Sequence, residues 1–250
     1  MSRVSIQWIA VALLILTGAC SSVGSVSTKL QSVKTVGVIS TIADEFTVTP
    51  AGLTGVASAD RTILIGSWGL DDLVVSRVGA VLSPRFQIQN VTYQRATFAR
   101  PEPASALPVV DRLRETPVKA LVRTEVSPQG LDAYVVVTKA SSRYGNSGHI
   151  VSGLGIVDGR TVLERYAEVY ALYTIWVIDG HSFEVIDKKS ASPLDNFYVI
   201  RLTGPSQKVD PAVLSVADLA ASDQVKAAFT DLVTRSLEAT LRDLRLVGQS

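Results

Sequence analysis

The sequence predicts one α/β domain of the α+β kind, in which a single mixed sheet is packed by two to three helices. Short segments rich in β-branched residues, bounded by Gly, Pro and Asp, recur between residues 35 and 187 and are typical of strands. Two longer segments repeat apolar residues at three- and four-residue spacing, which is typical of helices. A chain of 250 residues with 47% hydrophobic and 19% charged residues can bury a sizeable core, so it is not a disordered chain or a collagen-like repeat.

The first half of the domain reads as strand, strand pair, helix and strand. The expected strands are 35–40, 46–49, 62–65 and 86–93. The expected helix opens at Trp68-Gly69-Leu70-Asp71-Asp72, where the two acidic residues favour a helix start, and Pro84 ends it.

The second half reads as helix, central strand, paired strands and helix. Residues 109–126 are helix-like but divided at Pro117, and residues 132–137 predict a central strand. The apolar segment 167–178 is followed by the turn signal Asp179-Gly180 and by a returning strand. The last helix is expected to begin at Ser222 and to lie on the sheet through one apolar stripe, formed by Val225, Phe229, Leu232, Val233, Leu237, Leu241 and Leu244.

The amino terminus has the three parts of a secretory signal. Arg3 gives a positive start, residues 8–16 are an unbroken apolar run, and Thr17-Gly18-Ala19-Cys20 are small. The apolar run is far shorter than the ~20 residues that a membrane-spanning helix needs. We therefore expect residues 1–19 to be a signal peptide.

The segment Leu16-Thr17-Gly18-Ala19-Cys20 resembles the lipobox of bacterial lipoproteins, and it holds the only Cys of the chain. The usual Leu three residues before the Cys is replaced by Thr17, with Leu16 one position further back. The resemblance implies cleavage between Ala19 and Cys20, diacylglycerol on the Cys20 thiol and a further acyl chain, such as palmitate, on the new amino terminus. The alternative is an ordinary cleavage site, which would release a soluble secreted domain.

The residues after Cys20 suggest an address and a tether. Residues 20–32 are Ser/Gly-rich and are expected to link the lipid to a single domain at 33–250. Lipoproteins retained in the inner membrane usually carry Asp after the Cys, whereas this chain has Ser21. The resemblance therefore favours the periplasmic face of the outer membrane, if the source is Gram-negative.

A second resemblance concerns the strands of the domain. Asp132-Ala133-Tyr134-Val135, together with the hairpin from Ile178-Asp179 to Glu184-Val185, resembles a group of envelope α/β domains. The group includes the curli secretion-channel lipoprotein, the amino-terminal domain of the Tol translocation protein and lipoprotein activators of penicillin-binding proteins. It implies a fold more than a function.

No motif in the sequence predicts a catalytic residue, a metal site or a cofactor. Ser147 lies close to His149, but a Gly-x-Ser-x-Gly elbow is absent, and His181 follows a turn. The carboxylate pairs Asp71-Asp72 and Asp44-Glu45 are better explained as helix-start charge and solvated turn residues, because no His or Cys ligand pattern accompanies them. Residues 153–159 superficially resemble a nucleotide loop but lack its Gly-Lys-Ser/Thr, so we expect a flexible turn.

Trp68 lies between two glycines at a strand-to-helix junction. It is the candidate partner-binding residue, because Trp is enriched at the centres of interfaces, and the alternative is a Trp that caps the core.

These observations favour a non-enzymatic envelope lipoprotein, held at the membrane by its lipid and acting as an accessory, assembly or regulatory module on an envelope protein partner. The net charge of +1 lacks the positive field of a nucleic-acid binder. The alternative is a membrane-tethered periplasmic hydrolase that uses Ser147 with His149 or with a carboxylate of Asp71-Asp72.

Overall fold

The protein is described by a computed structural model. The structure describes residues 30–51, 59–99, 117–126, 129–145, 149–160, 162, 164–194, 202–244 and 246. The chain divides into a unit Met1–Val33 and a compact unit Lys34–Ser250, and the second unit contains the sheets. The predicted signal peptide, its cleavage site at Ala19 and Cys20, and residues 21–29 of the predicted tether lie outside the described residues.

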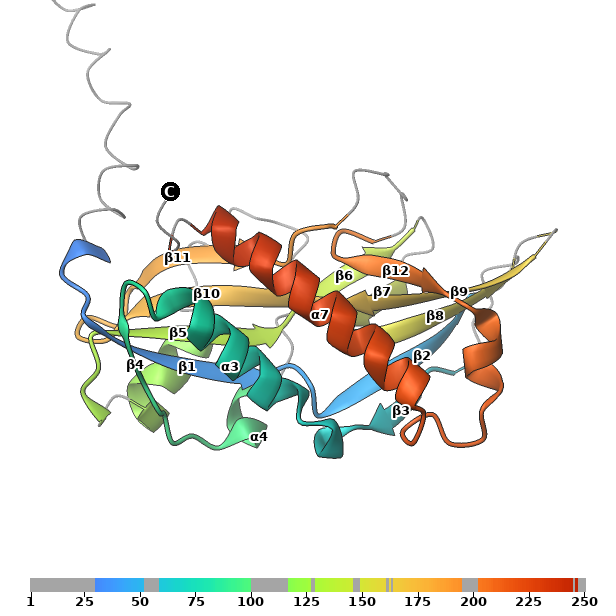
Figure 1. Ribbon diagram of the computed structural model, residues 1–250, viewed down its shortest axis with the longest axis horizontal. Coiled ribbons are helices and arrows are strands. Elements are labelled where there is room, and N and C mark those ends of the chain that lie inside the picture. The colour runs from blue at the N-terminus through green and yellow to red at the C-terminus, as the bar shows by residue number, and fades with distance from the viewer. Residues whose placement is uncertain are drawn as a thin grey trace, which may run out of the picture. The chain divides into compact units, whose positions relative to one another are not determined.

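Two five-stranded mixed sheets form the compact unit (Figure 1). The first sheet has the order β11 (Val185–Ser190), β10 (Tyr173–Asp179), β5 (Ala133–Lys139), β1 (Thr35–Thr41) and β4 (Gln87–Gln89). The second has the order β12 (Ser206–Val209), β9 (Arg165–Ala171), β8 (Leu154–Arg160), β2 (Glu45–Ala51) and β3 (Arg61–Leu64).

The two sheets share a strand pattern. β1 pairs in parallel with β5 and β2 in parallel with β8, while β5 and β8 pair antiparallel with β10 and β9. The chain passes from one sheet into the other at the short step from β1 to β2 and again at Leu172, between β9 and β10. At the second step Leu172 accepts a hydrogen bond from Ala140 N (3.0 Å) and donates to Gly153 O (2.8 Å).

The predicted fold class is confirmed, including the mixed strand directions and the carboxy-terminal helix on the sheet. The expected single sheet is replaced by two, because the chain leaves the line of β5 after Lys139 and makes the hairpin β6 (Ser141–Tyr144) and β7 (His149–Ser152) before β8 starts. Gly153 N donates to Ala140 O at 3.0 Å and so joins the two ends of the β6–β7 hairpin.

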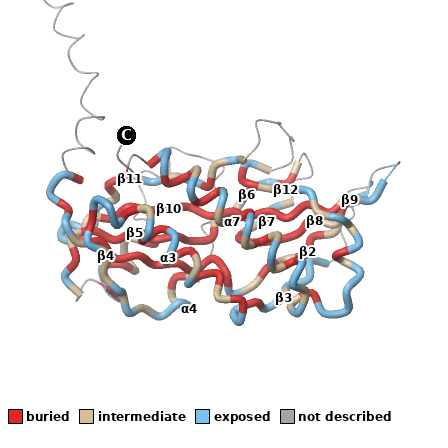
Figure 2. The backbone as a smooth tube through the Cα atoms, viewed as in Figure 1, coloured by how far each residue is buried: buried red, intermediate tan, exposed pale blue. Residues whose placement is uncertain are grey.

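One face of the sheets is covered by α3 (Leu70–Leu82) and α7 (Asp223–Asp243), which contact each other (Figure 1). α7 contacts β11 of the first sheet and β9 and β12 of the second. Ser222 caps α7 by accepting from Val225 N, and every residue of the predicted apolar stripe is buried. Figure 2 shows the buried residues running along the central strands beneath these helices.

Three rings tie this helical layer to the second sheet. Phe46 of β2 lies 5.7 Å from Trp68, of the short η1 helix (Gly66–Trp68), and 5.1 Å from Phe229 of α7, between ring centroids. The Trp68 ring nitrogen Nε1 donates to Ala220 O at 2.7 Å. The cluster joins three elements that are distant in sequence.

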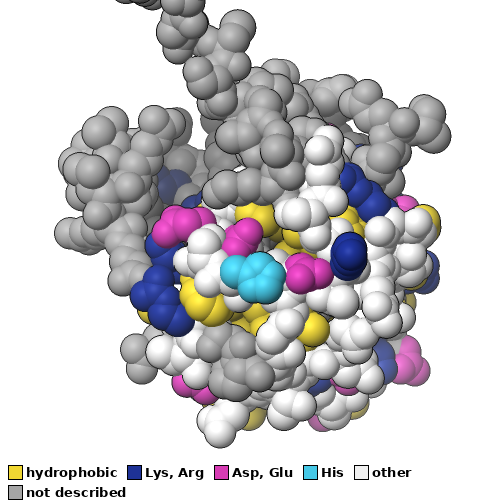
Figure 3. Space-filling view, turned by 90° about the vertical axis from the view of Figure 1, so that its left-hand side faces the viewer, with side chains coloured by type: hydrophobic (Ala, Val, Ile, Leu, Met, Phe, Trp, Pro, Cys, Tyr) yellow, Lys and Arg dark blue, Asp and Glu magenta, His cyan; other side chains and the backbone are white. Residues whose placement is uncertain are grey.

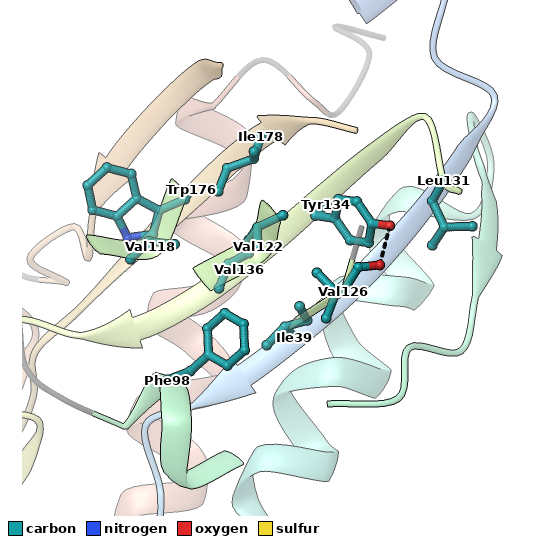
Figure 4. Packing of buried hydrophobic residues seen from close by; sticks show 10 residues of the cluster. All are labelled: Ile39, Phe98, Val118, Val122, Val126, Leu131, Tyr134, Val136, Trp176 and Ile178. Atoms are coloured by element: carbon teal, nitrogen blue, oxygen red, sulfur yellow. Dashed lines mark hydrogen bonds between the residues drawn. The ribbon is translucent and has the colours of Figure 1, made fainter. Parts of the chain in front are cut away.

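The opposite face of the first sheet is covered by the short helix α6 (Pro117–Leu121) and the helical turn η2 (Val122–Val126) (Figure 4). They enclose a cluster that includes Trp176 and Tyr134, and the Tyr134 hydroxyl donates to Val126 O at 2.9 Å. The helix expected over 109–126 is thus seen only from Pro117 onward, since residues 109–116 lie outside the described residues.

Three expectations about strands were wrong in detail. The segment expected as one strand over 86–93 forms β4 over only three residues, and the apolar segment 167–178 belongs to two strands, β9 and β10. The flexible turn expected at 153–159 is the buried strand β8. Its Gly155 and Gly159 pair with Tyr170 and Tyr166 of β9, whose rings lie over the glycines and fill the space that side chains would occupy.

Candidate functional site

The arrangement of the parallel strands points to the carboxyl end of β1. β1 lies between β4 and β5, and both pair with it in parallel. The chain reaches β4 after α3, on one face, and then reaches β5 after α6 and η2, on the other. β1 is therefore the point at which the winding of the sheet changes side, and open α/β sheets bind ligands outside the carboxyl ends of strands at such points.

A hollow of about 190 Å³ lies at that position. It is lined by the end of β1 and the residues after it, by the start of α3 and by α4 (Arg95–Phe98) with the residue that follows. The lining residues are Thr41, Ala43, Asp44, Gly66, Gly69, Leu70, Asp71, Arg95, Ala96 and Ala99. We refer to it as the β1 hollow.

Asp71 is the buried charged group of the β1 hollow, with 4% of its surface exposed. Its Oδ1 accepts from Ser40 Oγ at 2.6 Å and from Ile42 N at 2.9 Å, so it fixes the start of α3 to the end of β1. The sequence interpretation of Asp71 as helix-start charge described its place but missed these bonds. Within the described part of the chain, Oδ2 accepts no hydrogen bond and Asp71 has no salt-bridge partner.

The other charges around the β1 hollow are paired. Arg95 forms a salt bridge with Asp72, and although burial acts in the opposite direction, the carboxylates of Asp72 and Asp71 raise the pKa of its guanidinium. Lys139, which is 5% exposed, places its Nζ 2.5 Å from Asp44 and 3.1 Å from Glu45. Asp44 is exposed and Glu45 partly exposed, as expected of solvated turn residues, and they are also the salt-bridge partners of a buried lysine.

Sequence reasoning did not single out Thr41 or Arg95 as site residues. Thr41 Oγ1 donates to Phe98 O at 3.2 Å and so joins β1 to α4, which is distant in sequence. No local motif contains these residues, and the signal that could have found them is the order of the parallel strands.

Of the described residues of the hydrolase alternative, Asp71 lines the β1 hollow, while Asp72 and His149 do not. Ser147 lies outside the described residues. His149, in β7, has Asp60 beside it, with 3.4 Å between Nε2 and Oδ2. Asp71 and Asp72 instead engage Ser40, Ile42 and Arg95.

The second histidine, His181, lies near the start of β1, beside the Asp132 carboxylate that binds Thr35. Figure 3 shows one end of the unit, where a histidine side chain lies among acidic side chains. The His181 side chain is 75% exposed, and its Nε2 lies 3.4 Å from Asp132 Oδ1. Asp132 Oδ2 accepts from Thr35 N and Lys34 N, both at 2.9 Å, and these backbone bonds lower the pKa of the carboxyl group. Asp132 therefore holds the first residues of β1 to β5, with His181 as an exposed neighbour.

Trp68 is 9% exposed and occupies the ring cluster with Phe46 and Phe229. The hypothesis of an exposed partner anchor is therefore wrong for this residue, and the core-capping alternative describes it. Its polar ring nitrogen is satisfied by Ala220 O.

Two buried hydroxyls on the second sheet have no hydrogen-bond partner among the described residues, Thr49 Oγ1 and Tyr170 Oη. Burial raises the pKa of the Tyr170 hydroxyl. The Thr49 hydroxyl is close enough to act against this rise in pKa, but the two hydroxyls do not form a hydrogen bond. Tyr173, by contrast, donates to Ser236 Oγ of α7 at 2.8 Å, and burial raises its pKa to about 12.

These two tyrosines give a matched prediction. Tyr173→Phe is expected to lower the free energy of unfolding by about 1 kcal/mol, because it removes a made hydrogen bond. Tyr170→Phe is expected to leave it unchanged or raise it slightly, because that hydroxyl is buried without a hydrogen-bond partner among the described residues. Urea unfolding measures both, and an equal loss in the two variants would contradict the assignment.

The raised pKa of Tyr173 predicts how the stability of the protein responds to alkaline pH. A pKa raised in the folded state favours the neutral phenol, so the stability that depends on Tyr173 is complete below its ordinary pKa of 10.0 and is lost as the pH rises towards about 12. Tyr173→Phe should therefore lose less stability between pH 10 and pH 12 than the parent protein.

No group of three or more His, Cys, Asp and Glu side chains that could hold a metal ion occurs within the described residues. Among the helices that the structure describes, none has both the length and the apolar character to cross a bilayer.

No protein-family model matches the chain, and no curated protein sequence matches it. Among solved structures, it is similar to the hypothetical protein CT253 from Chlamydia trachomatis, with a TM-score of 0.34 and 10% identity over 87% of this chain and 99% of that one. It is also similar to the lipoprotein GNA1162 from Neisseria meningitidis, with a TM-score of 0.28 and 9% identity over 82% of this chain and 99% of that one.

Proposed function

We propose that the chain is a lipid-anchored envelope lipoprotein, held at the periplasmic face of the outer membrane and acting as a non-enzymatic accessory, assembly or regulatory module that binds an envelope protein. The observation that carries the proposal is the segment Leu16–Cys20, which places the only Cys of the chain directly after a signal-like apolar run and small residues. Two or more acyl chains on one residue anchor a protein stably, whereas one chain binds only marginally.

The length of chain between Cys20 and the domain would keep the domain close to such an anchor. β1 begins at Thr35, and the segment from Cys20 to Lys34 reaches at most ~50 Å when fully extended. The β1 hollow lies at the other end of β1 from this entry point. A partner that binds there would be another component of the same membrane or of the space beside it.

The non-enzymatic part of the proposal rests on how the polar side chains are used. The carboxylates that a hydrolase could recruit, Asp71 and Asp72, hold the end of β1 and Arg95. A catalytic group needs a nucleophile, a base and an orienting partner in mutual reach, and the described residues support other roles for these carboxylates.

The intact mass of protein purified from membranes tests the anchor. We expect a chain that starts at Cys20 and carries the mass of a diacylglyceryl group and an acyl group. Cys20→Ala should lose both additions and leave the membrane fraction, while the neighbouring Ser21→Ala, the control, should keep them. An unmodified chain cleaved elsewhere would overturn the anchor and leave a soluble secreted domain.

A further inference from the structure

We propose that the β1 hollow receives a single lysine side chain of a partner protein, whose ammonium group binds Oδ2 of Asp71. The inference rests on the proposed role as a binding module and adds the chemistry by which the partner is recognised.

The pairing of the carboxylates around the β1 hollow favours a cationic ligand. Three carboxylates lie in or beside the β1 hollow, and two of them have cations: Asp72 pairs with Arg95 and Asp44 with Lys139. Asp71 is the most buried of the three and is the one without a salt bridge in the described part of the chain. Its Oδ2 is the carboxylate oxygen that accepts no hydrogen bond in the described part of the chain, so it is open to a ligand that brings a positive charge and a hydrogen-bond donor.

An anionic ligand fits this position poorly. The start of α3 would attract an anion through its dipole, but that end of the helix already carries Asp71 and Asp72. The Arg95 guanidinium already pairs with Asp72 and lies close enough to Asp71 for the two charges to interact. An incoming phosphate or carboxylate would therefore meet Asp71 before it met an unpaired cation.

The small volume and partly apolar wall of the β1 hollow favour a single long side chain. Small-molecule sites typically measure ~300–1,000 Å³, whereas the β1 hollow measures about 190 Å³ and suits a group no larger than a side chain. Its wall includes the buried Ala43 and Leu70 and the half-buried Ala99. A lysine places a stem of four methylenes against such apolar atoms and keeps its charge for the polar end.

The bonding of Asp71 selects lysine over arginine. Arginine gains most when its planar fork meets both oxygens of a carboxylate. Oδ1 of Asp71 already accepts from Ser40 and Ile42, which leaves one oxygen for a ligand. A compact ammonium, which acts as a point charge with rotatable donors, matches a single open oxygen.

Titration of the full-length protein in detergent, observed by two-dimensional NMR, tests the proposal. The probes are capped Gly-Ser-Lys-Ser-Gly, the same peptide with norleucine or arginine in place of lysine, and butylammonium. We expect saturable shifts at Gly69–Asp72 and Ala99 with the lysine peptide, and binding at least tenfold weaker with norleucine. Equal binding of the lysine and norleucine peptides would overturn the role of the charge, and tighter binding of the arginine peptide would overturn the selection of lysine.

Butylammonium distinguishes between two sources of the ammonium group, a lysine side chain of a protein partner and a free amine. Weaker binding of butylammonium than of the lysine peptide supports a protein partner. If butylammonium saturates the site and the lysine peptide does not, the site accepts a free amine, and the proposed partner is overturned.

Two variants locate the binding. Ala99→Leu fills the wall of the hollow without removing a polar contact and is expected to abolish the shifts, while Ala80→Leu, which adds the same atoms on the exposed face of α3, should retain them. Asp71→Asn tests the charge itself, with folding checked from the dispersion of the spectrum. Unchanged binding in a folded Ala99→Leu protein would place the ligand elsewhere and overturn the assignment.

The two proposals fail separately. A chain with the lipid mass on Cys20 that does not bind the lysine peptide would remove the inference and leave the anchor. A chain that binds the peptide but lacks the lipid would remove the anchor and leave the β1 hollow.

Discussion

Replacing Gly155 with alanine is expected to lower the free energy of unfolding by about 3 kcal/mol, because overpacking a close-fitted site costs that much when the neighbours cannot move aside. A Cβ at Gly155 would lie 2.1 Å from Tyr170 Oη and 2.7 Å from the backbone oxygen of Thr47. The Tyr170 side chain is fully buried, and Thr47 O belongs to the neighbouring strand β2, so neither contact is relieved by a simple rotation.

Urea unfolding of Gly155→Ala beside Gly66→Ala measures this effect. A Cβ at Gly66 meets nothing within 4 Å, so the same substitution there is expected to change stability little. In thermal unfolding the Gly155 variant should melt lower by about 10 °C for a domain of this size. Equal stability of the two variants would show that the Tyr170 ring does not lie over β8.

Trp68→Ala is expected to cost about 3–5 kcal/mol, the usual loss when a large aromatic residue is removed from a core. The change removes the ring contacts with Phe46 and Phe229 and the hydrogen bond to Ala220 O, and it leaves a cavity where η1, β2 and α7 meet. The measurement is the same urea unfolding experiment, in which circular dichroism monitors the transition because its signal does not depend on the fluorescence of Trp68.

Leu64→Ala is the matched control for Trp68. Leu64 lies on the edge strand β3 and is 75% exposed, so its truncation is expected to change stability by less than about 0.5 kcal/mol. If Trp68→Ala were as stable as Leu64→Ala, the tryptophan would be an exposed residue after all and the partner-anchor hypothesis would return.

Local sequence pattern predicted the helices and strands that are defined by capping residues and by the regular spacing of apolar residues. The stripe from Val225 to Leu244 is buried throughout, and the helix begins after Ser222 as expected, because capping and helical spacing are both local properties. The strand expected over 132–137 is β5, which is buried along its whole length. The paired strands around Thr47 and Thr62 were also predicted correctly.

Features that depend on distant partners could not be read from local pattern. Gly155 and Gly159 indicate a turn when they are considered alone, and only the rings of Tyr170 and Tyr166 on the next strand make them part of a sheet. In the same way Asp71 reads as a helix-start residue until Ser40, 31 positions earlier, is seen to donate to it. The lipid on Cys20 stays a prediction from sequence.

The position of β1 has a mechanical consequence. A chain held by its amino terminus transmits tension into the domain at Thr35, along the axis of a strand that has parallel neighbours on both sides. A load along that axis would act on the hydrogen bonds with β4 and β5 together, since those bonds lie across the strand. The Asp132 bonds to Lys34 and Thr35 take the first share of that tension. Under the proposed lipid anchor, the start of β1 is thus the part of the domain that a pull on the amino terminus would load first.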